Sequence, residues 1–496
     1  MVQEFSAFIA GDRVKSGSEG TLKNINPADT NDVVGVFPSC GKEEVNQAAA
    51  SAKEAQKKWA LVPAPRRGEI LKKAGDLMVE RKEEVSELMT REMGKILLET
   101  RGDFQEGVDT AYYMAGEGRR LFGDTVPCEL PSKSGMSIRR PVGVCAMITP
   151  WNFPMAIPSW KIFPALICGN GVVFKPASDT PATAVKFIEI LLEAGVPEKL
   201  VNVLPGSGRN VGEAILAHPD IDLVSFTGST FVGRKIAAKC GETLKRCSLE
   251  MGGKNAQIVM EDADMELAIE VALWGAFGTT GQRCTATSRI IVHKSIAGEF
   301  IQEFEKRARD IRIGNGLDEN TQMGPLINES QRNNVAEYIK IGVEEDGAEL
   351  KLGGKALKQG EYSKGFFFEP TIFTNVKRNM RIAREEIFGP VVSIMEVSSF
   401  EEAVDVLNDT EYGLSSSIYT QDINRAFRAI RDIEAGITYI NGPTIGAEIQ
   451  LPFGGVKNTG NGHRESSHVV LDTYSEWKSV YIDYSGKLQR AQIDTD

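Results

Sequence analysis

The chain has 496 residues, and its 42% hydrophobic and 25% charged residues are typical of a soluble globular protein. A chain of this length exceeds one ordinary hydrophobic core and predicts two or three domains. Its formal net charge of −11 argues against a nucleic-acid partner, because binding to phosphates needs a basic surface, and gives no support to a role at a membrane surface.

Secreted, membrane and metal-dependent classes are also disfavoured. There is no run of about 18 apolar residues, and the N-terminal segment lacks the cationic and apolar regions of a signal peptide, so we expect a cytoplasmic protein. The 7 cysteines are scattered without a CxxC spacing, and the 4 histidines form no HExxH pair. We therefore expect no metal site and no disulfide framework, with most cysteines buried as small apolar side chains.

The pattern of apolar residues predicts an α/β protein. Apolar residues recur at helical spacing over 42–59, 64–80, 82–93 and 101–116. From residue 140 onward, the apolar runs VGVCAMITP, GVVFKP, LVNVLPG and LVSFTG alternate with helical stretches, which predicts a parallel, doubly wound sheet. The alternation resumes after residue 249, with strands AQIVME and SRIIVH and helices over 264–277 and 296–311, and predicts a second α/β domain.

Two further segments are predicted to be strands without an obvious local partner. They are KSGMSIRRP, before the first sheet, and SEWKSVYIDY, near the C-terminus. Because unpaired strand edges invite association, we expect a small β-flap that mediates assembly into a homo-oligomer.

Several predicted strands end in turns that suit a nucleotide. The segment VSFTGSTFVG passes from a strand through Gly228 into a helix, and LVNVLPGSG ends the preceding strand in a similar glycine turn. Helix N-terminal amides in such turns bind pyrophosphate, and nucleotides lie at the carboxyl edge of doubly wound sheets. Lys175 ends another strand, where its ammonium suits ribose hydroxyls or a phosphate. The alternatives are a simple chain reversal and a solvated loop lysine.

Three side chains are candidates for catalysis. Asn152 lies in the turn TPWNFP, where a rigid amide can donate to an oxyanion or, alternatively, stabilise the turn. Glu250 lies in the apolar segment LEMGGK, where burial would raise its pKa and make it a base near neutral pH; a structural ion pair is the alternative. Cys284 follows a helix in the segment GQRCTA, where the adjacent Arg283 and the helix terminus favour a nucleophilic thiolate.

Together these segments resemble those of NAD(P)-dependent aldehyde dehydrogenases over essentially the full chain. The motifs, in the order found in that family, are PWNFP at 150–154, FKPAS at 174–178, FTGST at 226–230, LEMGGKN at 249–255, GQRCTA at 281–286, EEIFGPV at 385–391 and PFGGVKNTG at 452–460. The resemblance implies a Rossmann-type cofactor domain from 1–120 and 141–252, an α/β catalytic domain from 253–452 and an oligomerisation β-flap from 121–140 and 470–490.

The resemblance also implies a mechanism with NAD or NADP as cofactor and no metal. Cys284 would attack a small aldehyde to form a thiohemiacetal, whose oxyanion is held by the Asn152 amide and the Cys284 backbone N–H. Hydride then passes to the nicotinamide, and water deprotonated by Glu250 hydrolyses the thioester to a carboxylic acid. Lys161 and Glu476 match a proton path behind Glu250.

Further binding roles follow from the same resemblance. The cofactor-binding residues would be Ile148, Thr149, Pro150, Trp151, Lys175, Ala177, Ser178, Gly208, Gly212, Phe226, Thr227, Gly228, Ser229, Glu250, Gly252, Glu386 and Phe388. Among them, Lys175 and Glu386 would hold the riboses, Phe388 would pack near the nicotinamide, and Gly228 with Ser229 would approach the pyrophosphate. The substrate-binding residues would be Glu106, Arg283, Gly446, Ala447 and Phe453.

Two positions depart from the family pattern. Ser178 stands where strongly NAD-preferring members carry a glutamate on the adenosine ribose. Without that glutamate, no carboxylate repels a 2′-phosphate, so we expect NADP to be accepted, alongside NAD. The segment NGHRE at 461–465 has His463 where members usually read GxGRE, and the sequence does not indicate the effect.

Arg283 raises the question of the substrate. The helix around residues 105–109 and the loop at 443–448 resemble those of dehydrogenases that act on amino-acid-derived semialdehydes, in which an arginine beside the cysteine holds a carboxylate. This favours 2-oxoglutarate semialdehyde, then 2-aminoadipate or succinate semialdehyde. The alternative is a structural salt bridge at Arg283 and a broad range of aliphatic or aromatic aldehydes.

Other functional classes stay open from the sequence. A cysteine hydrolase would need Cys284 and Glu250 but neither the glycine turns nor Lys175. A CoA-acylating relative would use the cysteine but usually lacks the hydrolytic glutamate. A non-catalytic paralogue would tolerate the loss of Cys284 or Asn152.

Overall fold

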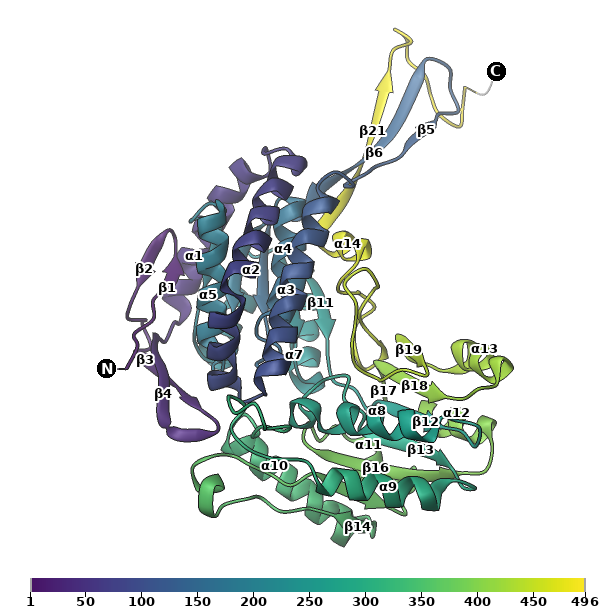
Figure 1. Cartoon of the computed structure of the whole chain (residues 1–496). Helices are drawn as coiled ribbons and strands as arrows, with labels where there is room; N and C mark the ends of the chain where they lie inside the picture. The colour runs from purple at the N-terminus through teal and green to yellow at the C-terminus, as the bar shows by residue number, and fades with distance from the viewer. Residues whose placement is uncertain (1, 495–496) are drawn as a thin grey trace.

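The computed structural model describes residues 2–494 and contains two mainly parallel sheets, each packed between helices, and a smaller sheet that projects from the first (Figure 1). The predicted α/β class is confirmed. The first sheet has the spatial order β11 (Arg246–Glu250), β10 (Leu223–Thr227), β7 (Val144–Ile148), β8 (Gly171–Lys175), β9 (Val201–Val203), β1 (Ala7–Ile9) and β2 (Asp12–Val14). Its strands from β11 to β9 are parallel.

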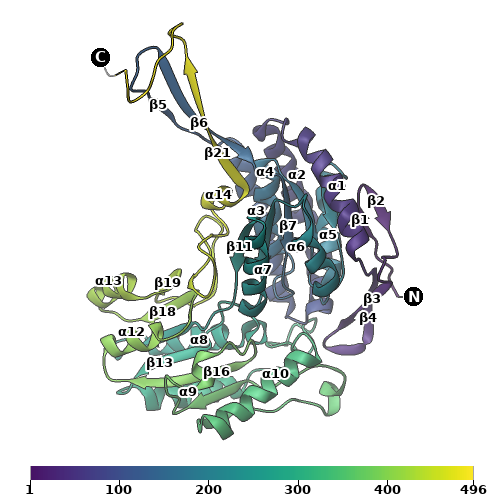
Figure 2. The same ribbon diagram turned by 180° about the vertical axis from the view of Figure 1, so that it is seen from behind.

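Both faces of the first sheet are buried, because successive side chains of a strand point to opposite faces. Cys145 and Met147 of β7 pack in the cluster formed with α2 (Ala64–Met93), α3 (Leu97–Glu117), α4 (Ala156–Cys168) and α5 (Pro181–Ala194). Val144 and Ala146 pack in the cluster formed with α1 (Lys42–Trp59), α6 (Glu213–Ala217) and α7 (Thr230–Glu242). Figures 1 and 2 show the two helical layers from opposite sides.

The separate helices predicted at 64–80 and 82–93 are wrong, because one helix, α2, runs without a break over 30 residues. The polar residues at the predicted boundary are Glu80, Arg81 and Lys82, which are good helix formers and supply no stop signal. The helix has Pro65 in its first turn and ends at Gly94, whose φ of +91° is left-handed.

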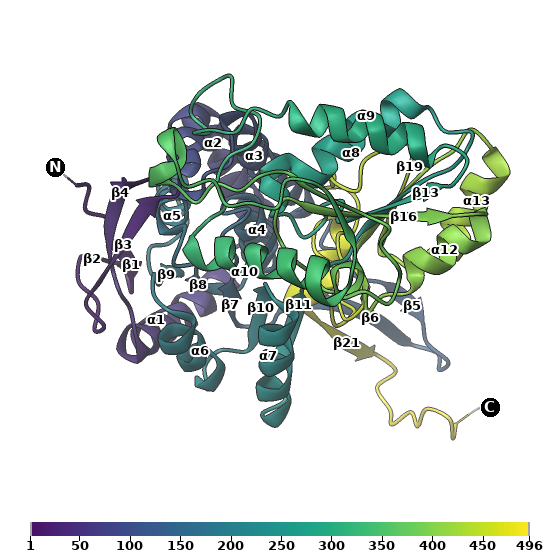
Figure 3. The same ribbon diagram turned by 90° about the horizontal axis from the view of Figure 1, so that it is seen from below.

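The second sheet has the spatial order β14 (Glu349–Leu352), β15 (Thr371–Thr374), β16 (Val391–Val397), β13 (Arg289–His293), β12 (Ala256–Val259), β18 (Ser415–Tyr419) and β19 (Ile437–Ile440). Helices α8 (Met265–Phe277) and α9 (Ala297–Arg309) pack on one face. Helices α10 (Glu329–Lys340), α11 (Arg381–Arg384), α12 (Phe400–Asn408) and α13 (Ile423–Asp432) pack on the other. Figure 3 shows these two layers from below.

The two strands predicted without local partners pair with each other. Strand β21 (Ser475–Asp483), which follows α14 (Leu471–Tyr474), runs antiparallel to β6 (Lys133–Pro141), with Ser475 opposite Pro141 and Asp483 opposite Lys133. Strand β5 (Thr125–Pro127) pairs with the other edge of β6. This three-stranded flap extends away from the body (Figure 1).

Two short ladders complete the described secondary structure. They are β3 (Thr21–Asn26) with β4 (Asp29–Pro38), and β17 (Tyr412–Gly413) with β20 (Val456–Lys457). Within residues 2–494, none of the helices combines the length and apolar character needed to cross a bilayer.

Candidate active site

A strained loop presents Cys284 between the two sheets. Thr279, Thr280 and Gly281 have φ angles of +52°, +58° and +67° in succession, a conformation that is costly for the two threonines. A side chain at Gly281 is excluded because its Cβ would lie 2.1 Å from the Gly389 carbonyl oxygen. The loop therefore requires glycine at this position to bring Cys284 to the site.

Hydrogen bonds hold the loop on both sides of the cysteine. The side chain of Gln282 accepts from the Ile327 N–H at 3.0 Å and donates to the Thr279 carbonyl at 3.2 Å. The Cys284 carbonyl accepts from Asn255 Nδ2 at 2.7 Å. These bonds fix the backbone and leave the thiol facing a cavity.

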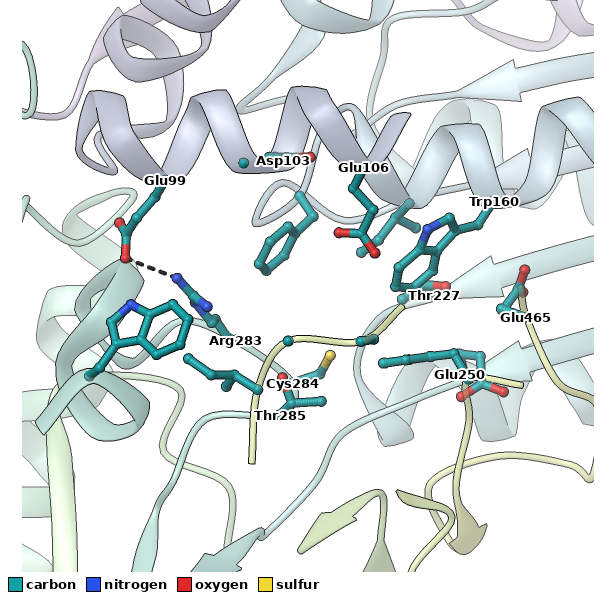
Figure 4. A pocket seen from close by; sticks show the side chains of 18 of the residues that line it. Glu99, Asp103, Glu106, Trp160, Thr227, Glu250, Arg283, Cys284, Thr285 and Glu465 are labelled. Carbon is teal, nitrogen blue, oxygen red and sulfur yellow. Dashed lines mark hydrogen bonds and ion pairs between the residues drawn. The ribbon is translucent and has the colours of Figure 1, made fainter. Parts of the chain in front are cut away.

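The cavity has a volume of about 260 Å³ and is lined by residues from β10 and β11 of the first sheet, from α3, α4 and α8, and from the loops between elements (Figure 4). Cys284 and Glu250 line it together with aromatic side chains. The residues predicted to bind substrate all line the same cavity: Glu106, Arg283, Gly446, Ala447 and Phe453. Trp160 packs on Phe453 with ring centroids 4.8 Å apart, which makes one wall apolar.

The Cys284 thiol is not made acidic by its neighbours. Burial, together with the carboxylates of Glu386 and Glu250, raises its pKa to about 12. The expectation that Arg283 favours the thiolate is wrong, because its guanidinium pairs with Glu99 instead. The thiol must therefore lose its proton to a base when it attacks a substrate.

Asn152 lies beside the cysteine loop. Its Nδ2 donates to the Gln282 carbonyl at 3.1 Å, and its side chain is only 2% exposed. The Lys95 ammonium donates to the Asn152 carbonyl at 3.0 Å and forms a fully buried ion pair with Asp103 at 2.7 Å. This buried pair fixes the backbone of Asn152, so its amide is positioned in advance of substrate binding.

Glu250, at the end of β11, is buried with no hydrogen-bond partner for either carboxylate oxygen within the described residues. Burial raises its pKa well above the usual range for a glutamate, and the charge of Glu465 raises it further. Two neighbouring glycines make room, since a Cβ at Gly454 would lie 2.6 Å from Glu250 Oε1 and one at Gly460 would lie 3.6 Å from it.

The carboxylate that accompanies Lys161 is Glu465, and the prediction of Glu476 is wrong. Lys161 Nζ lies 2.6 Å from Glu465 Oε1 and 2.9 Å from Ser225 Oγ, and both charged side chains are buried. Glu476 lies at the base of the flap with its side chain 56% exposed, 3.6 Å from Arg246. Strand β21 carries Glu476 away from the site, whereas the loop after β20 returns Glu465 to it.

The sequence around Glu465 carries a signal for this role. It is the last residue of NGHRE, the segment noted for His463, and it follows the motif PFGGVKNTG by a few residues. His463 itself lies outside the cavity, where its Nδ1 is 3.3 Å from Thr473 Oγ1, and burial lowers its pKa. The spacing alone did not show which glutamate faces Lys161.

Most of the predicted cofactor residues lie at the carboxyl edge of the first sheet. The register places Ile148 beside Lys175 and Phe226, and Thr227 beside Glu250. The residues that end or follow these strands are Ile148, Thr149, Pro150 and Trp151 after β7, Lys175, Ala177 and Ser178 after β8, Phe226, Thr227, Gly228 and Ser229 after β10, and Glu250 and Gly252 after β11.

The glycine turns at this edge have distinct structural roles. Gly208 and Gly212 bound a helical turn that precedes α6, and a Cβ at either would meet open space. Ser229 caps α7 by accepting from the Val232 N–H at 3.4 Å. A Cβ at Gly228 would lie 2.5 Å from the Phe226 ring. The turn that precedes α7 therefore requires glycine at position 228.

Two charged side chains that could hydrogen-bond to ribose hydroxyls lie at the carboxyl edge of the first sheet. Lys175 is 5% exposed, its ammonium donates to the Pro176 carbonyl at 2.7 Å, and burial lowers its pKa to about 8. Glu386 accepts from the Gly253 N–H at 3.1 Å, and burial raises its pKa to about 7. A Cβ at Gly252 would lie 2.1 Å from the Glu386 carboxylate. Only glycine at position 252 therefore leaves room for the Glu386 side chain.

Phe388 and Ser178 complete the predicted cofactor residues. The ring of Phe388 meets that of Trp151 edge to face, with centroids 5.4 Å apart. The Ser178 hydroxyl donates to the Gly206 carbonyl at 3.0 Å.

Arg283 lies at the opposite end of the cavity from Glu250 (Figure 4). Its Nη2 is 2.9 Å from Glu99 Oε1, and its Nε donates to Thr279 Oγ1 at 2.8 Å. The guanidinium also lies 5.6 Å from the Trp274 ring centroid and 5.7 Å from that of Phe153. It is thus both a cavity residue and a member of a structural ion pair.

Comparison with known proteins decides the family. A family model described as "Aldehyde dehydrogenase family" matches residues 14–480. The chain belongs to the aldehyde dehydrogenase family. It is therefore an NAD(P)-dependent oxidoreductase of aldehydes, as the sequence motifs implied.

Individual aldehyde dehydrogenases match over almost the whole chain. An alpha-ketoglutaric semialdehyde dehydrogenase of Bacillus subtilis is 43% identical over 96% of this chain and 97% of its own length. An alpha-ketoglutarate semialdehyde dehydrogenase of Haloferax volcanii is 40% identical over 96% of this chain and 98% of its own. The crystal structure of betaine aldehyde dehydrogenase from Staphylococcus aureus with NAD+ superposes with a TM-score of 0.95, at 34% identity, over 98% of this chain and 96% of that one.

Proposed function

We propose that the protein oxidises a semialdehyde bearing a distal carboxylate to the corresponding dicarboxylic acid, with 2-oxoglutarate semialdehyde as the first candidate. The observation that carries this proposal is Arg283, the one cationic residue among those that line the cavity of Cys284 in the described chain. A planar guanidinium suits a carboxylate, and two relatives that are 43% and 40% identical are named for this semialdehyde.

The ion pair with Glu99 leaves Arg283 able to bind a ligand. Within residues 2–494, Nε and Nη2 make hydrogen bonds, whereas Nη1 makes none. A substrate carboxylate at the outer end of the cavity would use these remaining donors. Glu106 supports the assignment because burial raises its pKa to about 8, so it is largely neutral at pH 7 and does not repel an anion.

Cys284, Asn152 and Glu250 account for the chemical steps. Glu250 takes the thiol proton as Cys284 Sγ bonds to the aldehyde carbon, and the oxyanion so formed accepts from Asn152 Nδ2 and the Cys284 backbone N–H. A bound nicotinamide dinucleotide supplies the acceptor for the hydride lost from that carbon. Glu250 then takes a proton from water, whose oxygen bonds to the thioester carbon as the Cys284 thiolate leaves.

The proton on Glu250 has a route through buried charges. Lys161 and Glu465 lie behind it as an ion pair, and the charge of Glu465 raises the Glu250 pKa. A buried, charged pair near a base of raised pKa suits proton transfer away from the cavity. We assign this role to Lys161 and Glu465.

The residues at the strand edge fit a dinucleotide. The α7 N-terminus and the open space at Gly208 and Gly212 suit a pyrophosphate, and the Lys175 ammonium and the Glu386 carboxylate suit ribose hydroxyls. Ser178, at the position predicted to bind the adenosine ribose, has a small neutral hydroxyl. We propose that NADP is accepted as well as NAD, because no carboxylate at that position repels a 2′-phosphate.

A cationic aldehyde is the second candidate substrate. Glu99, Asp103 and Glu106 line the cavity with the rings of Trp160 and Trp274, a combination that binds ammonium groups. However, Asp103 pairs with Lys95 and Glu99 with Arg283, and Glu106 is largely neutral at pH 7. These pairings favour the anionic substrate.

Steady-state NAD(P)H production tests the substrate proposal. Aldehydes of matched chain length, with a terminal carboxylate, methyl or trimethylammonium group, are compared in wild type, Arg283→Ala and Arg283→Lys. We expect carboxylated aldehydes to lead in kcat/KM by about a hundredfold and to lose this lead in Arg283→Ala. An equal loss for every aldehyde, or a lead for the trimethylammonium substrate, would overturn it.

We also propose that the flap mediates homo-oligomerisation. A three-stranded sheet that projects alone is weakly stabilised, and it exposes apolar side chains: Val126, Ile138, Trp477, Tyr481 and Ile482 are each at least 40% exposed. Light scattering after size exclusion should show a dimer or tetramer that dissociates in Tyr481→Asp but not in Lys358→Asp, on a distant exposed loop. Dissociation in neither variant would count against the flap.

A cytoplasmic location is proposed from the cysteines. All seven are free in the structure, which fits a reducing compartment.

A further inference from the structure

Two cysteines outside the active site lie together where α7 meets β11. Cys240 is in the last turn of α7, and Cys247 is the second residue of β11. The chain reverses tightly between them, with the Lys245 N–H donating to the Cys240 carbonyl at 2.9 Å and Leu244 in a left-handed conformation at φ +57°. This turn packs the partly buried Cys247 against the apolar cluster that contains Cys240.

The two thiols have different surroundings. Cys240 is fully buried, whereas Cys247 is partly exposed. The proximity of the two thiols lowers the pKa of Cys247 and raises that of Cys240. Cys247 is therefore the more acidic and accessible thiol of the pair, in contrast to the active-site Cys284, whose pKa is raised to about 12.

We propose that Cys240 and Cys247 form an oxidisable dithiol, with Cys247 as the thiol that reacts with hydroperoxides and Cys240 as the thiol that resolves it. The Cys247 thiolate attacks hydrogen peroxide and becomes a sulfenic acid as hydroxide leaves. The Cys240 sulfur then bonds to the Cys247 sulfur and water leaves. In total, two thiols and one peroxide give one disulfide and two waters.

The site of this bond connects it to the active site. Cys247 lies three residues before Glu250 on the same strand. Asn461 Nδ2 donates to the Cys247 carbonyl at 2.8 Å and lies 3.7 Å from its sulfur, while Asn461 Oδ1 accepts from the Leu249 N–H at 3.0 Å. Turning the Cys247 sulfur toward Cys240 disturbs this link between β11 and the segment that carries Glu465. We expect oxidation to lower kcat reversibly.

Peptide mapping tests the bond directly. Trypsin cleaves after Lys239, Lys245, Arg246 and Lys254, so the disulfide would join peptide 240–245 to peptide 247–254, while the catalytic thiol is reported separately by peptide 284–289. The purified full-length protein is treated with hydrogen peroxide, alkylated and digested without reductant. We expect the linked pair in wild type and in Cys128→Ser, and a sulfenic acid at Cys247, trapped by dimedone, in Cys240→Ser.

Cys128 is the matched control because it is also partly exposed but lies between β5 and β6, outside the turn that joins α7 to β11. In the reduced protein at pH 7, iodoacetamide should modify Cys247 several-fold faster than Cys128. Absence of the linked peptides from wild type overturns the dithiol, whether Cys247 stays free or is oxidised further.

Activity tests the coupling to the active site. After mild peroxide treatment, kcat should fall several-fold in wild type and recover with dithiothreitol, beyond any change seen in Cys240→Ser, which retains Cys284. If the linked peptides form and kcat matches that of treated Cys240→Ser, the coupling to Glu250 is refuted.

Discussion

The two ends of the cavity obtain their geometry in different ways. At the inner end, Cys284, Asn152 and Glu250 are fixed by backbone: a left-handed loop, a turn tied to a buried ion pair and the end of a central strand. At the outer end, Arg283 and Glu106 are placed by side-chain pairing and burial. Sequence motifs therefore identify the inner residues, whereas the charge available at the outer end depends on partners far away in the chain.

The largest effect should come from the inner end. Cys284→Ser removes the nucleophile, so kcat for aldehyde oxidation should fall at least about a thousandfold. Cys128→Ser, on the flap, should retain wild-type kcat. NAD(P)H production by the two variants, with circular dichroism to verify folding, makes this comparison. Substantial turnover by Cys284→Ser would remove the cysteine from the proposed mechanism.

The next largest effect should come from the buried ion pair between Lys161 and Glu465. Glu465→Gln leaves the Lys161 ammonium buried without a carboxylate, so the free energy of unfolding should fall by about 3–5 kcal/mol. Glu476→Gln alters an exposed side chain and should change it by less than about 0.5 kcal/mol. Urea denaturation measures both. If the two variants are equally stable, the assignment of Glu465 over Glu476 is wrong.

Glu99 should affect substrate binding without affecting the chemical step. In Glu99→Gln, Arg283 loses a competing carboxylate while Thr279 keeps an oxygen acceptor. We expect the KM of carboxylated aldehydes to fall about fivefold, since a partly buried charge pair is worth roughly 1 kcal/mol. The KM of aldehydes with a terminal methyl group should not change. An increase in KM for the carboxylated substrates would mean that Glu99 orients Arg283 productively.

The smallest effect should be a pH dependence from Glu106. Its pKa of about 8 keeps it neutral at lower pH, and it becomes negatively charged as the pH rises through this value. Repulsion should then raise the KM of a carboxylated substrate a few-fold between about pH 7 and 9. The increase should be absent in Glu106→Gln and for uncharged aldehydes. A pH profile unchanged by Glu106→Gln would assign the titration to another group.

Much of the fold and of the inner site could be predicted from the sequence, because the signals are local. The alternation of apolar runs and helical stretches gave the parallel sheets, and Cys284, Glu250 and Asn152 each lie in a distinctive short motif. The continuity of α2 was missed because a polar stretch of good helix formers was interpreted as a boundary. The partner of β6 was missed because β21 follows it by more than three hundred residues.

The sequence by itself determined the family and the α/β class and identified the candidate catalytic residues, because each depends on residue types at short spacing. Only the tertiary structure decided that Glu465 pairs with Lys161, that Arg283 pairs with Glu99, and that the pKa of the Cys284 thiol is raised rather than lowered. It also brought Cys247 against Cys240. Ion pairing and burial depend on distances between segments remote in the chain, and those distances exist only after the sheets, helices and loops have packed.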